Sequence, residues 1–363
     1  MSKKMFDFVI GNPPFQQDMQ DTSDTPVYHE FMDETYKIAT SVELITPARF
    51  LFDAGKTPKA WNQKMLNDKH LKVLMYEPDI KKVFPSMGFK GGVAVTIRDS
   101  LKNYGAIEMF ISEPILRSLK EKVVTARNFT SINTIIFSPE SYKFSENLYI
   151  DHPEIKTMTK FDKKKNTLVP LISKGHDYDL TTNVFDNLYN IVFFDDKPDD
   201  NKKYASVEGR LNNARKRMII EEKYIKNDKN FSKWKVFLPK SNGSGTLGET
   251  LSTPLVGEPL VGEPLVGHTQ TYLSFGAFNT EYEANSCFKY IKTKFARVML
   301  GILKVTQDNK AGTWRYVPLQ DFTSNSDIDW SKSIHEIDLQ LYKKYGLDDK
   351  EIEFIETHVK EME

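Results

Sequence analysis

The stretch Phe6-Asp7-Phe8-Val9-Ile10-Gly11-Asn12-Pro13-Pro14-Phe15 decides the fold of the first part of the chain. The residues up to Ile10 are mostly apolar, β-branched or aromatic, which predicts a short buried strand of an α/β sheet. Each proline fixes its own φ and keeps the residue before it out of the helical region, so residues 12–15 form a stiff corner. This corner follows the carboxyl end of a strand, where open α/β sheets bind their ligands.

The corner suits chemistry at the exocyclic amine of a purine. The amine of adenine is a poor nucleophile because its lone pair is delocalised into the ring. Two acceptors aimed at its hydrogens, the Asn12 side-chain oxygen and the Pro13 carbonyl, would favour the pyramidal and nucleophilic form. Phe15 can hold the base by stacking. The alternative interpretation of these residues is a strand followed by a rigid turn with no chemistry.

The corner resembles motif IV, Asn-Pro-Pro-Phe/Tyr, of the DNA adenine-N6 methyltransferases. The segments ITPARFLF (45–52) and VFPSMGFKGGVAVTIRD (83–99) follow it and look like motifs VI and VIII of the gamma group. The chain is therefore similar to the methylase portion of type II restriction-modification enzymes that fuse cleavage and modification. The resemblance extends over nearly the whole chain, but only motif IV is specific enough to carry chemistry.

The resemblance implies a site, a cofactor and a mechanism. It gives catalytic roles to Asn12, Pro13, Pro14 and Phe15, and it makes Phe15, Phe84 and Phe89 candidates for contact with a flipped base. Packing in the core is the alternative for Phe84. The implied cofactor is S-adenosylmethionine, whose site in this family precedes motif IV. Since only five residues precede Phe6, we expect the cofactor-binding half to come from an upstream segment or a partner chain, and the isolated chain to be inactive. We also expect an exposed edge at the first strand.

Further patterns extend the predicted fold. Residues 26–40 have a helical apolar stripe, and residues 41–46, 70–76 and 91–98 have the composition of strands. Alternating helices and strands predict a partial doubly wound, Rossmann-like parallel sheet that lacks its cofactor-binding half. We expect three parts: a catalytic half over 1–110, a mixed α+β target-recognition domain over 111–330, and a helical tail over 331–363.

Recognition of double-stranded DNA needs local basic or polar clusters, because 50 Lys and Arg balance 50 Asp and Glu and the net charge is zero. We expect a helix over 209–226 whose basic residues contact phosphates, with a solvated charged face as the alternative. The candidate DNA-binding residues are Arg210, Arg215, Lys216, Arg217, Lys240, His268 and Gln270.

Residues 253–267 read TPLVG, EPLVG, EPLVG, a tandem pentapeptide repeat. Proline and glycine in every unit favour turns and extended segments over helix. Three units are too few for a solenoid. We expect one unit to be structural and the others to be insertions.

Several other functions are disfavoured. The stretch Gly243 to Gly248 matches G-x-G-x-x-G, but prolines on both sides leave little room for the helix that a dinucleotide site requires. Pro198-Asp199 with Glu221-Glu222-Lys223 imitates a nuclease pattern, but we place these residues in a loop and a helix. A single cysteine excludes a multi-cysteine zinc site, and we expect no metal. No signal peptide or long apolar run is present, so we expect a cytoplasmic protein with no membrane contact.

The sequence thus predicts a site-specific DNA adenine-N6 methyltransferase of a restriction-modification system. One alternative is a non-catalytic DNA-recognition (specificity) module that acts with a partner chain. Another is an RNA or protein methyltransferase, since Asn-Pro-Pro corners also occur in those enzymes.

Overall fold

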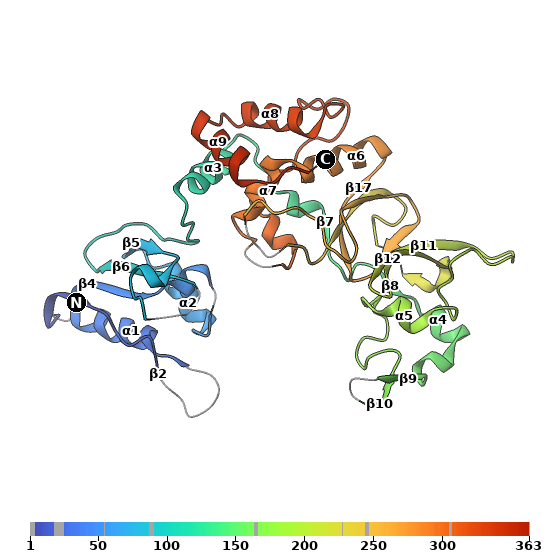
Figure 1. Ribbon diagram of the computed structural model, residues 1–363, viewed down its shortest axis with the longest axis horizontal. Coiled ribbons are helices and arrows are strands. Elements are labelled where there is room, and N and C mark those ends of the chain that lie inside the picture. The colour runs from blue at the N-terminus through green and yellow to red at the C-terminus, as the bar shows by residue number, and fades with distance from the viewer. Residues whose placement is uncertain are drawn as a thin grey trace. The chain divides into compact units, whose positions relative to one another are not determined.

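The chain divides into two units, Met1–Glu113 and Pro114–Glu363 (Figure 1). The computed structural model describes residues 4–17, 25–53, 55–86, 91–162, 166–226, 228–243, 247–304 and 307–362. Among these residues, no helix has both the length and the apolar character needed to cross a bilayer. The boundary between the units lies just before α3 (Pro114–Val124), and the C-terminal helices belong to the second unit.

The first unit is built on a sheet with the strand order β1-β4-β6-β5. In this sheet β1 (Phe6–Gly11) runs parallel to β4 (Ala39–Pro47), whereas β6 (Val93–Asp99) is antiparallel to both β4 and β5 (Leu71–Glu77). The mixed α/β character agrees with the sequence, but the expectation of a purely parallel sheet is wrong. A parallel pair needs a crossover, usually through a helix. The described part of the β5–β6 connection holds only the short turn η2 (Ile80–Lys82).

Among the described residues of the first unit, helices cover one face of this sheet. The helices α1 (Tyr28–Ile38) and α2 (Lys59–Leu66) share a hydrophobic core with β4, which includes Met32, Leu44 and Met65. The predicted first strand forms, but only Val9 on its inner face packs against that core. On its outer face Phe6, Phe8 and Ile10 are 48%, 50% and 73% exposed. The strand is therefore buried on one face rather than on both.

The second unit contains an antiparallel sheet and a group of helices. The sheet has the order β15-β14-β17-β7, with β7 (Ile136–Phe137), β14 (Trp234–Pro239), β15 (Leu260–Gly262) and β17 (Tyr272–Phe278). The helices α6 (Glu281–Lys292), α7 (Lys294–Gly301), α8 (Ile334–Lys344) and α9 (Asp349–His358) pack on one another, and α6 also contacts β14 and β17. Capping boxes begin α6, α8 and α9.

A second sheet, β12-β11-β16, corrects the helix expected over 209–226. Residues in this region form the hairpin of β11 (Tyr204–Leu211) and β12 (Ala214–Glu221), and β16 (Val266–His268) runs parallel to β11. Asn212 and Asn213 form the two-residue turn with φ of 51° and 62°. Asparagine adopts positive φ more easily than most residues, so this pair favours a tight hairpin.

The pentapeptide repeat occupies three different places in the second unit. In the first copy of the pentapeptide (residues 253–257), Thr253 and Gly257 exchange backbone hydrogen bonds in a turn. The second supplies β15, which pairs with β14, and the third supplies most of β16. The expectation that only one unit is structural is therefore wrong. Each copy has its own pairing partner.

The remaining elements are short. The strands are β2 (Gln16–Gln17), β3 (Thr25–Pro26), β8 (Lys143–Phe144), β9 (Thr159–Asp162), β10 (Thr167–Pro170) and β13 (Ile225–Lys226). The helical segments are α4 (Glu146–Asp151), α5 (Val184–Leu188), η1 (Ala48–Phe52), η3 (Ile132–Ile135), η4 (Pro153–Lys156), η5 (Glu222–Tyr224) and η6 (Ala311–Trp314).

Candidate active site and nucleic-acid contacts

The Asn-Pro-Pro-Phe corner, residues 12–15, directly follows β1. Asn12 and Pro14 are exposed, while Pro13 and Phe15 are partly buried. The Val27 N–H donates a hydrogen bond to the Phe15 carbonyl at 3.3 Å, which ties the corner to the start of α1. Asn12 therefore projects from a fixed backbone and is not part of the packed interior.

The fold brings Phe84 against this corner. The Phe84 N–H donates to the Ile80 carbonyl at 2.7 Å, which holds it on the turn after β5. Its ring centroid lies 5.7 Å from that of Phe15, with the planes at 80°. β1, β4 and β5 all run in one direction, so the loops that follow them gather at the same end of the sheet. Both rings are partly exposed and offer surface to a planar ligand. The third aromatic candidate, Phe89, lies outside the described residues.

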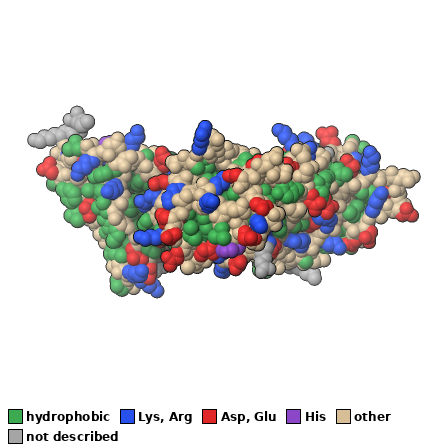
Figure 2. Space-filling view, turned by 90° about the horizontal axis from the view of Figure 1, so that it is seen from above, with side chains coloured by type: hydrophobic (Ala, Val, Ile, Leu, Met, Phe, Trp, Pro, Cys, Tyr) green, Lys and Arg blue, Asp and Glu red, His purple; other side chains and the backbone are tan. Residues whose placement is uncertain are grey.

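In the second unit, three of the candidate DNA-binding residues line one cavity. Arg210, Lys240 and Gln270 surround a space of about 320 Å³, together with loop residues of the first repeat unit. Sequence reasoning did not select Thr182, Ser241, Asn242 and Gln307, which line the same cavity. These four residues lie in irregular segments where no periodicity could single them out. Figure 2 shows Lys and Arg side chains interspersed with Asp and Glu across the face in view.

Three other candidates bind groups of the protein itself. The Arg215 guanidinium donates to the Glu258 carbonyl. Lys216 pairs with Asp195 at 2.5 Å, and this hydrogen-bonded carboxylate raises the pKa of Lys216. Arg217 pairs with Glu208 at 2.7 Å. A phosphate would have to compete with these partners.

His268 corrects the expectation of a surface position, because its side chain is completely buried. Its Nδ1 lies 3.0 Å from the Thr269 carbonyl and its Nε2 3.1 Å from the Ser274 hydroxyl. Burial lowers the pKa of His268 to about 3. A neutral ring that donates from Nδ1 and accepts at Nε2 satisfies both contacts. The side chain supports the interior of the unit and is not accessible to a base.

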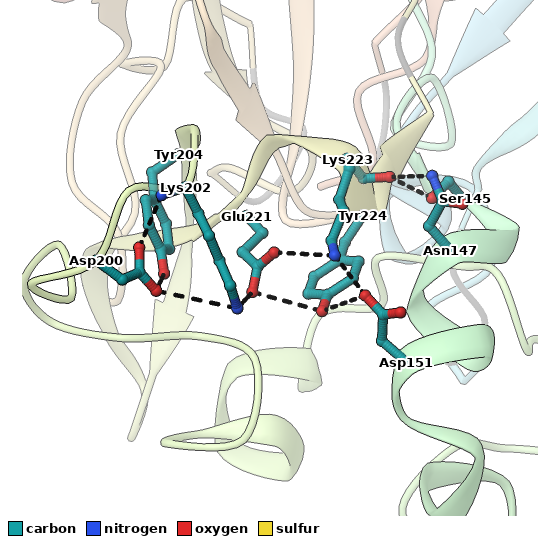
Figure 3. A network of polar contacts seen from close by, with 9 residues as sticks. All are labelled: Ser145, Asn147, Asp151, Asp200, Lys202, Tyr204, Glu221, Lys223 and Tyr224. Atoms are coloured by element: carbon teal, nitrogen blue, oxygen red, sulfur yellow. Dashed lines mark hydrogen bonds and ion pairs between the residues drawn. The ribbon is translucent and has the colours of Figure 1, made fainter.

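Two of the residues that imitate a nuclease, Glu221 and Lys223, belong to a network of ion pairs instead (Figure 3). Glu221 ends β12 rather than lying in a helix, and it pairs with Lys202 at 2.5 Å and Lys223 at 3.3 Å. Lys223 also pairs with Asp151 at 2.5 Å, which raises the pKa of the lysine. The network joins the hairpin to α4. In the part of the chain that the structure describes, no three His, Cys, Asp or Glu side chains are arranged to hold a metal ion.

A model of the Eco57I restriction-modification methylase family matches residues 1–84. Among solved structures, the chain is similar to the type IIG restriction endonuclease BpuSI, with 10% identity and a TM-score of 0.31, over 93% of this chain and 48% of that chain. It is also similar to the type IIL restriction-modification enzyme MmeI in complex with DNA, with 10% identity and a TM-score of 0.38, over 97% of this chain and 56% of that chain.

The chain thus spans about half the length of these two structures. A comparison of the sequence with curated proteins finds no match. The segment with the family match contains β1, the corner and Phe84. Residues 1–84 are therefore similar to the methylases of the Eco57I restriction-modification family.

Proposed function

We propose that this chain is the part of a DNA adenine-N6 methyltransferase that carries motif IV, within a restriction-modification system. The observation that carries the proposal is the exposed Asn12 on a rigid corner, with Phe84 packed edge-on against Phe15. This arrangement lies inside the segment that matches a methylase family. Double-stranded DNA is the proposed substrate, and the second unit is its proposed recognition domain.

In the proposed mechanism the target adenine leaves the duplex and stacks on Phe15, with Phe84 beside it. The Asn12 side-chain oxygen and the Pro13 carbonyl accept the two hydrogens of the exocyclic amine. The corner is rigid, so these acceptors need little reorganisation as positive charge develops on the nitrogen. The acceptors thereby stabilise the cationic methylated amine, which afterwards releases its extra proton to water, so that no side chain has to act as a general base before transfer. Pro14 fixes the orientation of the Pro13 carbonyl because it restricts the backbone of the residue before it.

The proposed methyl donor is S-adenosylmethionine, but the described residues do not fit it. Its usual cradle is a glycine-rich turn between a strand and a helix. Gly243 and Gly248 come after β14, and no helix among the described residues follows them before α6. We therefore place the donor on an upstream segment or a partner chain. The residues of this chain hold and orient the adenine.

The test is Asn12→Ala, introduced into the native gene so that any other part of the enzyme is present. Loss of one preorganised acceptor typically costs about 3–4 kcal/mol in the barrier, or roughly a hundred- to thousandfold in rate. We expect N6-methyladenine to disappear from one recognition sequence in genomic DNA, as measured by single-molecule sequencing. Asn103→Ala is the matched control, since Asn103 is an exposed residue of the same unit whose side chain accepts only the Gly105 N–H. Unchanged methylation in the Asn12→Ala strain would refute the assignment.

One alternative is a non-catalytic recognition module, because the described residues do not form a site that fits the cofactor. In that case methylation would persist in the Asn12→Ala strain while the chain still binds duplex DNA. The two functions therefore give opposite results in the same experiment.

A further inference from the structure

The cavity that contains Arg210, here called the Arg210 cavity, is built on fixed backbone in the second unit. The Lys240 N–H donates to the Thr271 carbonyl at 2.9 Å, and the Gln270 N–H donates to the Leu180 carbonyl at 2.8 Å. The first bond holds the end of β14 against the turn before β17, and the second ties that turn to Leu180. Arg210 reaches the same space from near the end of β11. Three separate segments thus place their polar side chains around one volume.

The charged side chains that line this cavity are positive. Its lining includes Arg210 and Lys240 and, among the described residues, no aspartate or glutamate, although the Glu249 carboxylate lies against Gly243 of the same lining. The nearest partner of Lys240 is Glu140 at 3.9 Å, a half-exposed surface pair that contributes little. Two cations that line a concave site attract an anion.

Two buried donors that belong to lining residues lack partners among the described residues. Asn242 is only 2% exposed, and its Nδ2 makes no hydrogen bond there. The Nε of Arg210 is also buried and unpaired, although another nitrogen of its guanidinium donates to Asn183 at 2.6 Å. A buried donor without an acceptor costs about 1–3 kcal/mol. A ligand in the cavity would contact the accessible nitrogens of Arg210 and Lys240 rather than these two atoms.

One wall of the cavity is apolar and comes from the first unit of the pentapeptide repeat. Pro254, Leu255 and Val256 line it. The two hydrogen bonds between Thr253 and Gly257 hold this loop closed. A lining that combines apolar side chains with two cations suits the two parts of a nucleotide, the apolar face of a base and a charged phosphate. The volume of about 320 Å³ suits a ligand of that size.

We propose that the Arg210 cavity is a nucleotide-phosphate site, with Arg210 and Lys240 on the phosphate and Gln270 on a base edge. In the complex with DNA the phosphate belongs to the strand being read, and this part of the inference rests on the proposed function. A free nucleotide has the same chemistry, so the experiment separates the two sources.

The experiment measures binding of a fluorescein-labelled DNA duplex pool and of 5′-dAMP to the full 363-residue chain. Arg210→Gln and Lys240→Gln are the test variants. Lys203→Gln is the matched control, because it removes the same charge from an exposed lysine just before β11. At about 3.3 Å per residue, it lies roughly 23 Å from Arg210 along the strand. We expect each test variant to weaken duplex binding about tenfold and to lower the salt slope by about one, with less than a twofold effect of the control.

The outcomes separate the two ideas. If 5′-dAMP binding depends on Arg210 and Lys240 but duplex binding does not, the nucleotide site stands and its DNA role fails. If the wild type binds duplex and all three variants bind equally well, the cavity is not a phosphate site, while the proposed function is untouched. Equal losses in all three variants mean general electrostatic attraction and also overturn the inference. Binding of neither ligand by the wild type overturns it too.

Discussion

His268 shows how burial determines the role of a single residue. The ring lies between the Thr269 carbonyl and the Ser274 hydroxyl, and the Asn230 amide donates to that same hydroxyl at 3.0 Å. The serine oxygen therefore accepts from Asn230 and can donate its proton to the imidazole. This chain of donors requires a neutral histidine. The free energy of unfolding should consequently depend on pH.

The folded-state pKa of His268 is about 3, below the ordinary value of 6.5. Between these values the unfolded chain binds a proton that the folded chain does not bind. The free energy of unfolding should therefore fall as pH drops from about 6.5 towards 3, by about 1.4 kcal/mol per pH unit from this group. His268→Gln keeps polar atoms but does not titrate, so its stability should fall less steeply with acid. Denaturant unfolding at pH 7 and pH 5 measures both slopes.

His152→Gln is the control for this measurement, since the His152 side chain is 28% exposed. It makes the same substitution outside the core and so shows how much of any change in slope comes from the substitution itself. Equal slopes for the wild type and His268→Gln would mean that the imidazole is protonated in the folded protein.

The corner residues were the most predictable part of the site, because two prolines restrict the backbone locally. Burial was not predictable at this scale. His268 stands in a polar stretch, HTQTY, that resembles a surface loop in sequence. Only the pairing of β16 with β11 places it in the interior.

At the scale of elements, the hairpin of β11 and β12 replaces the helix that was predicted over 209–226. The spacing of the basic residues explains the wrong prediction. Arg210, Arg215 and Arg217 with Lys216 and Lys223 repeat at intervals that also suit a helix. In the hairpin Arg210 lies opposite Arg215, and Glu208 lies opposite Arg217. The signal for the hairpin was the pair Asn212-Asn213, which is a weaker turn signal than Asn-Gly. The cross-strand ion pair of Glu208 and Arg217 could not be found without that register.

The repeat makes a prediction at the same scale. Deletion of residues 258–262 leaves one EPLVG unit, which can form either β15 or β16 but not both. Lys235 donates to the carbonyls of Glu263 and Val266, which belong to the third copy of the repeat. If the remaining copy forms β15 instead of β16, the buried Lys235 side chain also loses these acceptors. We expect the free energy of unfolding of the second unit to fall by more than about 2 kcal/mol. Urea unfolding followed by tryptophan fluorescence measures the loss.

The matched control inserts one extra EPLVG after Gly262. Both strands remain available and the added residues lengthen a loop, which costs about 1 kcal/mol or less. Equal stability of the deletion variant and the wild type would show that the copies are interchangeable.

At the scale of the whole molecule, the sequence predicted the strands of the first unit but not their directions. Residues 91–98 have the composition of a strand in either direction, and only pairing with β4 and β5 shows that β6 is antiparallel. The division into units near residue 113 follows from contacts across the chain. Local sequence patterns indicate whether a segment is a helix or a strand. The direction of a strand and its pairing partners depend on residues far apart in sequence.

The apolar side chains that β1 exposes among the described residues of the first unit predict association. Across the strands, Ile10 of β1 pairs with Glu43 of β4, which pairs with Ile97 of β6. The neighbouring cross-strand row contains Ile45, Val95 and Met75. Exposed apolar surface next to an unpaired strand edge is an association site. We expect Phe8→Thr with Ile10→Thr to reduce concentration-dependent association of the chain and its binding of the dye ANS, as measured by light scattering and fluorescence.

Leu101→Thr is the control for this pair, because Leu101 is 76% exposed in a turn outside the sheet. It should leave association and dye binding as in the wild type. If the double variant and the control behave alike, the sheet face is not the surface that associates.

The three copies of the pentapeptide also have an evolutionary consequence. Slippage during replication adds or removes whole units and keeps the reading frame, because each unit is a whole number of codons. Gains are tolerated as longer loops, whereas losses remove a strand, so selection should act against contraction more strongly than against expansion. Related strains should therefore have three or more copies of the pentapeptide and rarely fewer. The extra copies would lie close in sequence to the residues that line the Arg210 cavity.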